Sequence, residues 1–179
     1  MITSGLYSLL LIITLAVQAG LIASLPLPFR LFPLAMVVGI ILLHERSVVL
    51  GAVWLLMTGV VLEARGLGGG LAIAGATSAL VAVLLVNFVF AKRSFWALLG
   101  IAAGTSLSFV LARWSWLLLM SMITDQTIQF DHLVRQGLTM VALTVAGVFI
   151  FGMYIRRFIR WSRNKFVSKE QLYDISFPQ

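Results

Sequence analysis

The stretch Leu71–Ala91, with the sequence LAIAGATSALVAVLLVNFVFA, decides the fold because it contains no Asp, Glu, Lys or Arg. A helix that crosses a membrane needs roughly 20 predominantly apolar residues. A transmembrane barrel strand would alternate apolar and polar side chains over ~10 residues, and this stretch does not alternate. Because the backbone must satisfy its own hydrogen bonds in hydrocarbon, the stretch predicts a membrane-spanning helix that ends before Lys92-Arg93.

The composition of the whole chain agrees with this prediction. Of its 179 residues, 61% are hydrophobic and 11% are charged, and the mean hydropathy is +1.06. A soluble domain carries about 25% charged residues. The first apolar run is longer than the ~7–15 residues of a signal-peptide core, and no Lys or Arg precedes it. The chain is therefore predicted to be an integral membrane protein with a retained N-terminal helix.

Charges and prolines divide the chain into six apolar segments. We expect helices at Leu6–Leu25, Leu31–Leu43, Ser47–Leu62, Leu71–Ala91, Phe95–Met120 and Gly137–Ile155. The predicted fold class is all-α: one bundle of six transmembrane helices over residues 1–155, followed by a basic amphipathic tail over residues 156–179. At 1.5 Å per residue the second and third segments reach only about 20–24 Å, less than the ~30 Å hydrocarbon core. They form either a re-entrant pair or two spans that thin the bilayer, and we prefer two spans.

The positions of Lys and Arg predict the orientation. With six spans and the tail inside, the inner segments carry one, two and six basic residues, nine in total, and the three outer segments carry one each. The polar segment Ser121–Gln136 is then an outer loop. An inner-membrane protein with both termini in the cytoplasm is expected. The net charge of +7 therefore indicates topology and no nucleic-acid partner.

Glu63 and Arg113 are the candidate charges near the outer face. Charged side chains close to a membrane interior are costly, and they usually pair or reach water. We predict an ion pair between them, the alternative being that each extends separately to the interface. Trp114 and Trp116 are expected to anchor the outer end of their helix at headgroup level, with a stacking site for a sugar or aromatic ligand as the alternative.

Small residues recur at every fourth position on two segments, where they let helix backbones approach closely. They are expected either to pack within the bundle or to dock another protein. The two stripes consist of Gly70, Ala74 and Ser78, and of Gly100, Gly104 and Ser108.

The tail carries a basic cytoplasmic face. Arg156, Arg160 and Arg163 recur at helical spacing, and Arg157 adds a further charge. Such a helix is expected to lie along an anionic inner leaflet or to dock a cytoplasmic partner as well.

The sequence contains no recognisable catalytic or metal-binding pattern. His44 and His132 fall on opposite sides of the membrane in this topology, and the chain has no cysteine. The link Gly66–Gly70 lacks the Lys-Ser/Thr of a phosphate-binding loop. Asp131-His132 is expected to belong to a solvated loop. We therefore expect a protein that is not an enzyme and that has no cofactor, metal or soluble small-molecule substrate.

The region from Pro33 to Ala91 resembles MreD, the family of small inner-membrane rod shape-determining proteins. The resemblance is carried by the turn His44-Glu45-Arg46, by Gly51 and Gly59, by the acidic Glu63, and by the link Gly66–Gly70. Gln18 in the first segment also fits, whereas the family more often has Asp where this chain has Glu63.

The resemblance implies six spans, cytoplasmic termini and a non-enzymatic role in bacterial cell-wall elongation. Its implied partners are MreC, the MreB filament, the RodA glycosyltransferase and a class B penicillin-binding protein. The alternative is the substrate-binding component of an energy-coupling-factor vitamin transporter, which is similar in length, layout and fold. Those components dock through small residues in their first helix, and Ala19 and Ala23 have that spacing.

Overall fold

The computed structural model describes residues 2–22, 24–27, 29–64, 69–89, 94–124 and 130–173 of the chain. These residues form helices and no strand, as the all-α prediction requires. The six α-helices are α1 (Ile2–Val17), α2 (Leu34–Glu45), α3 (Val48–Ala64), α4 (Leu71–Leu84), α5 (Phe95–Thr124) and α6 (Phe130–Tyr173). Wider π-helical turns continue α1 as η1 (Gln18–Ile22) and α4 as η3 (Leu85–Val89), and a short 3₁₀ turn, η2 (Phe29–Leu31), precedes α2.

Three of the helical segments are long and apolar enough to cross a membrane. These are Leu71–Phe88, Phe95–Thr124 and Phe130–Ile155. The other apolar helical segments, Leu9–Ile22, Leu34–Glu45 and Val48–Ala64, are shorter, at 10–17 residues. The structure is thus compatible with a membrane protein, and the crossing of the three shorter helices stays a prediction.

The prediction of a loop over Ser121–Gln136 is wrong, because the described parts of this segment, residues 121–124 and 130–136, are helical. Its expected location on the outer side stays a prediction. Helix α5 continues to Thr124, and α6 begins at Phe130. Beyond Ile155 the helix α6 continues to Tyr173, as expected for a helical tail. A helix satisfies its own backbone hydrogen bonds in water as well as in lipid, and Gln, Arg and Lys are good helix formers. A change from apolar to polar residues therefore does not mark the end of a helix.

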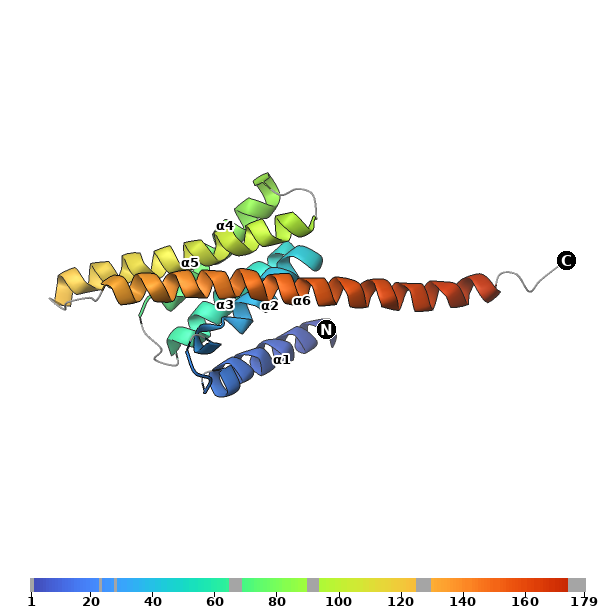
Figure 1. The fold of residues 1–179 in the computed structure, drawn as a ribbon, viewed down its shortest axis with the longest axis horizontal. Helices are drawn as coiled ribbons and strands as arrows, with labels where there is room; N and C mark the ends of the chain where they lie inside the picture. Colours follow the sequence, from blue (N-terminus) through green and yellow to red (C-terminus); the bar gives the residue numbers. More distant parts are fainter. Residues whose placement is uncertain are drawn as a thin grey trace. The chain divides into compact units, whose positions relative to one another are not determined.

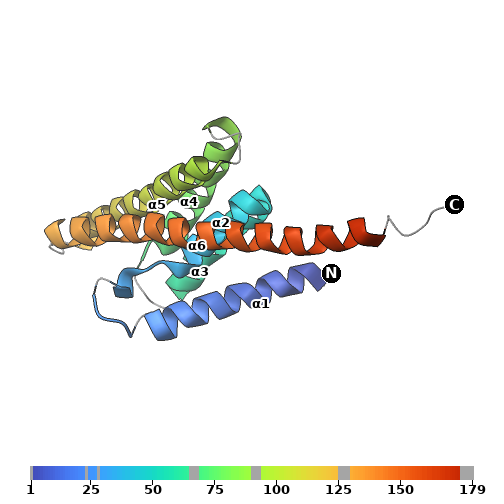
Figure 2. The ribbon, with the colours of Figure 1, turned by 45° about the vertical axis from the view of Figure 1, so that its right-hand side comes forward.

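The chain divides into two compact units, Met1–Val148 and Phe149–Gln179, with the boundary inside α6. The boundary therefore precedes the division at residue 156 that the composition suggested. In the first unit, α3 packs against both α2 and α4, and α4 packs against α5 (Figures 1 and 2). Its largest fully buried side chains include Ile40, Leu43, Leu98 and Ile101.

Apolar side chains also cover the outside of the first unit. Val49 and Val53 on α3 are 72% and 55% exposed, and Ile12 on α1 is 64% exposed. Helices that are apolar all round are typical of a membrane environment. This surface suits contact with lipid.

Helices α3 and α4 pack through glycine. A Cβ atom added to Gly59 would lie 2.9 Å from Cα of Gly75, and one added to Gly75 would lie 2.9 Å from Cα of Gly59. Such small residues let two helix backbones touch where lipid supplies no hydrophobic drive between them. Both glycines are buried.

We predict that Gly59→Ala lowers the free energy of unfolding by about 1–3 kcal/mol, because the added methyl group meets backbone atoms that cannot rotate away. The unfolding midpoint in detergent micelles measures the loss. Gly20→Ala is the matched control, since a Cβ at Gly20 would have no atom within 4 Å. Equal midpoints for the two variants would contradict this packing.

Candidate functional site

A polar junction joins the first three helices at Ala35. The backbone N–H of Ala35 donates to Oε1 of Gln18 at 2.9 Å, and Nε1 of the buried Trp54 donates to the carbonyl oxygen of Ala35, also at 2.9 Å. The first N–H groups of a helix have no partner inside it, so Gln18 caps α2 from the start of η1. The hydrogen bonds of this junction were not predicted from the sequence, although a lone Gln and a Trp inside apolar runs are a signal for them.

Glu63 caps the next helix at the same end of the first unit. Its Oε2 accepts a hydrogen bond from the N–H of Ala72 at 2.7 Å, and its Oε1 accepts one from the N–H of Gly70 at 3.2 Å. Gly70 precedes α4 with a φ of 83° and has no side chain that could cap the helix. A negative charge at a helix N-terminus is favourable. Glu63 therefore stabilises the start of α4.

The predicted ion pair between Glu63 and Arg113 is not formed. Among the described residues, the contact between an acidic and a basic side chain is that of Oε1 of Glu45 with Nδ1 of His44, at 3.1 Å, which is an ion pair when His44 is protonated. The carboxylate of Glu63 is held instead by the backbone of the next helix. The sequence shows the sign of each charge, but it does not show which backbone N–H groups lack a partner.

Arg113 lines a cavity of about 170 Å³ at this end of the first unit. Three other polar side chains line the same cavity, those of Gln18, Thr58 and Ser78. The rest of the lining is apolar and includes the buried side chains of Met36, Leu55 and Phe109, with half-buried Leu31, Phe32, Leu62 and Met140. The cavity thus combines an apolar wall with one cation.

The hydroxyl groups in the cavity donate to their own helices. Thr58 Oγ1 donates to the carbonyl of Trp54 and Ser78 Oγ to that of Gly75, each at 2.8 Å. Arg113 differs, because its Nε atom is buried and has no hydrogen-bond partner among the described residues. The guanidinium of Arg113 therefore has an unused donor in the cavity.

A second, smaller cavity of about 40 Å³ also contacts Arg113. The two cavities share Leu31, Phe109 and Met140 as well. A cavity of this size holds a water molecule or two. Arg113 therefore borders both cavities.

The two predicted interfacial tryptophans pack against glycines of neighbouring segments. A Cβ atom at Gly70 would clash with the ring of Trp116, and one at Gly137 would clash with the ring of Trp114. Both tryptophans are half-buried. Both rings therefore pack between α5 and neighbouring segments at the end of the first unit where the cavity lies.

The first small-residue stripe lies inside the bundle. Ala74 and Ser78 are 0% exposed, and Gly70 is buried beneath Trp116. These residues cannot form an external docking face. On α5, a Cβ at Gly104 would lie 2.6 Å from Cδ1 of Leu85, and Gly100 and Ser108 are half-buried.

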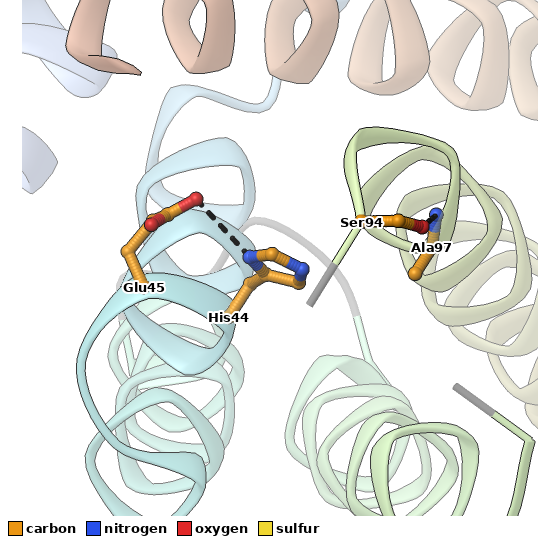
Figure 3. Close-up of polar contacts among 4 residues, drawn as sticks. All are labelled: His44, Glu45, Ser94 and Ala97. Carbon is orange, nitrogen blue, oxygen red and sulfur yellow. Dashed lines mark hydrogen bonds and ion pairs between the residues drawn. The ribbon is translucent and has the colours of Figure 1, made fainter. Parts of the chain in front are cut away.

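His44 and Ser94 lie at the opposite end of the first unit. Figure 3 shows the His44 ring beside Glu45 and pointing toward the start of α5, where Ser94 Oγ accepts the N–H of Ala97 at 3.0 Å. His132 approaches Gln136 one turn further along α6, at 2.8 Å. No group of three or more potential metal ligands occurs in the described ranges.

Some predicted features fall outside the described part of the chain. These are the side chains of Arg156, Arg160 and Arg163 and the residues Gly66 to Gly68 of the glycine-rich link. Arg157 is exposed.

We predict that Glu63→Ala lowers the free energy of unfolding by about 1–3 kcal/mol, because two backbone N–H groups lose their acceptor. Glu63→Gln keeps one acceptor oxygen and is expected to lose less. The exchanged double variant Glu63→Arg with Arg113→Glu should not recover stability. Recovery to the wild-type unfolding midpoint would restore the ion-pair hypothesis.

Comparison of the chain with protein-family models, with curated proteins and with solved structures finds no significant match. The functional inference therefore depends on the cavity, the caps and the hydrogen bonds described above.

Proposed function

We propose that this protein is a non-enzymatic integral membrane scaffold of the bacterial cell-shape and cell-wall elongation machinery, similar to MreD. One observation carries the non-enzymatic part. Every buried hydroxyl side chain in the described residues donates to a carbonyl oxygen three or four residues earlier in its own helix. These side chains are Thr14, Thr58, Ser78, Thr105, Ser106 and Thr144.

A nucleophilic hydroxyl needs a base within hydrogen-bond reach, at about 2.6–3.2 Å. Here each hydroxyl proton is directed to the main chain instead. This arrangement satisfies polar groups in an apolar medium, which is a structural task. It supports a packing role for these side chains.

The proposed topology has six spans and both termini in the cytoplasm. The turn after α2 and the start of α5 lie at one end of the first unit, and the turns before α2 and α4 lie at the other (Figure 1). The positive-inside rule assigns Arg46 and Lys92-Arg93 to the cytoplasmic side. The Arg113 cavity then lies toward the outer side.

The proposed partners are an MreC-like protein and other components of the elongation machinery. The exposed apolar faces of α1 and α3 are the candidate contact surfaces, since partner helices approach such a protein through the membrane. Leu9, Ile12 and Ile13 on α1 and Val49 on α3 are at least half exposed. The basic tail, with exposed Arg157, would face the cytoplasmic filament.

The Arg113 cavity is the observation that favours the alternative, a vitamin-binding component of a transporter. Its volume of about 170 Å³ is below the ~300–1,000 Å³ of sites that enclose a small molecule. Most of its lining is apolar, and two of its four polar side chains already use their protons within their helices. These features favour the scaffold.

Co-expression with the MreC-like protein of the same genome tests this proposal. We expect the tagged chain to co-elute with it at a fixed ratio in size-exclusion chromatography in mild detergent. An unrelated single-span membrane protein, expressed in the same way, is the control and should separate. Separation of the MreC-like protein, together with retention of a vitamin by the purified chain, would contradict the scaffold and favour the transporter component.

A further inference from the structure

We propose that the Arg113 cavity binds the phosphate of an anionic membrane phospholipid, with the guanidinium of Arg113 as its counter-charge. This inference goes beyond the scaffold function, because it assigns a ligand to a site inside the first unit. It depends on the charge, depth and lining of the cavity.

The charge of Arg113 is not compensated by the described residues. Its side chain is half-buried, and its Nε atom is buried without a hydrogen-bond partner. Glu63 does not pair with Arg113, because both oxygens of its carboxylate accept hydrogen bonds from backbone N–H groups at the start of the next helix. Asp131 is exposed on the first turn of α6. A cation held in an apolar lining is costly unless an anion or water reaches it.

The depth of Arg113 matches the level of lipid headgroups. Arg113 follows Phe95, the first residue of α5, by 18 residues, which corresponds to about 27 Å along a helix. The hydrocarbon core is ~30 Å thick. When α5 spans the membrane from Phe95, Arg113 therefore lies near the opposite interface, where lipid phosphates are found.

The hydrogen-bonding groups of the cavity favour a ligand that accepts. The hydroxyl groups of Thr58 and Ser78 already donate hydrogen bonds to carbonyl oxygens. Gln18 uses its Oε1 to accept the N–H of Ala35, which leaves its NH₂ group as a donor. The guanidinium of Arg113 offers a planar fork of N–H groups that matches phosphate oxygens bidentately. The side chains of Gln18 and Arg113 therefore both offer N–H groups to a ligand that accepts hydrogen bonds.

The rest of the lining selects a lipid over free phosphate. Met36, Leu55 and Phe109 form buried apolar walls, which suit methylene groups and offer nothing to a fully hydrated ion. A volume of about 170 Å³ admits one phosphate and the adjoining part of a chain but not a whole lipid. The remainder of the lipid would follow the exposed apolar surface of the helices.

Lipid-dependent thermal unfolding of the full chain in a neutral detergent tests the proposal. We expect phosphatidylglycerol to raise the unfolding midpoint of the wild type, whereas phosphatidylcholine and inorganic phosphate do not. In native mass spectrometry the wild type should retain one phosphatidylglycerol. Arg113→Gln should abolish the rise and weaken retention roughly tenfold or more, as expected for loss of a charge-assisted hydrogen bond.

Arg135→Gln is the matched control, because Arg135 is an exposed arginine near the start of α6, at the same end of the first unit. It should keep the full response to phosphatidylglycerol. Arg113→Lys, which keeps the charge but loses the planar fork, provides a second variant if Arg113→Gln does not fold, and it should bind several-fold more weakly. Equal lipid retention by the Arg113 and Arg135 variants would overturn the proposal, as would an equal effect of inorganic phosphate.

Discussion

A buried backbone N–H needs a hydrogen-bond acceptor, and the first turns of α2 and α4 obtain theirs from side chains of earlier helices. Gln18 serves Ala35, and Glu63 serves Gly70 and Ala72. The residues directly before these helices are Pro33 and Gly70, and neither has a side chain that caps the helix. The demand for acceptors therefore determines how successive helices meet at this end of the first unit.

This constraint also explains how the few polar residues are used. Hydroxyl groups donate to carbonyl oxygens of their own helices, whereas the amide of Gln18 and the carboxylate of Glu63 reach the next helix. Arg113 differs from these side chains, because its buried Nε has no acceptor among the described residues. The Nε of Arg113 is therefore a donor without a partner in a mostly apolar lining, and the cavity beside it has room for an acceptor.

The sequence predicted the helical segments well where apolar residues are uninterrupted. Leu71 begins α4 directly after the glycine-rich link, and Phe95 begins α5 shortly after Lys92-Arg93, as expected. It failed where polar residues continue a helix, as between Ser121 and Gln136. It also failed for Glu63, whose partners are backbone N–H groups at the start of α4. The sequence does not show which backbone N–H groups lack an acceptor. Small-residue spacing identified the α4 stripe but could not show that its members face the bundle interior.

The wider turn of η1 fixes the rotational register of the N-terminal helix. Gln18 is the first residue of this turn, and its amide is tied to α2 at Ala35. Each residue of an α-helix advances by about 100° around its axis. Loss of Ala16 or Val17 would therefore rotate the whole preceding helix by about that angle. Buried Thr14 and Leu15 would then turn away from the bundle, so this segment tolerates substitutions far better than changes in length.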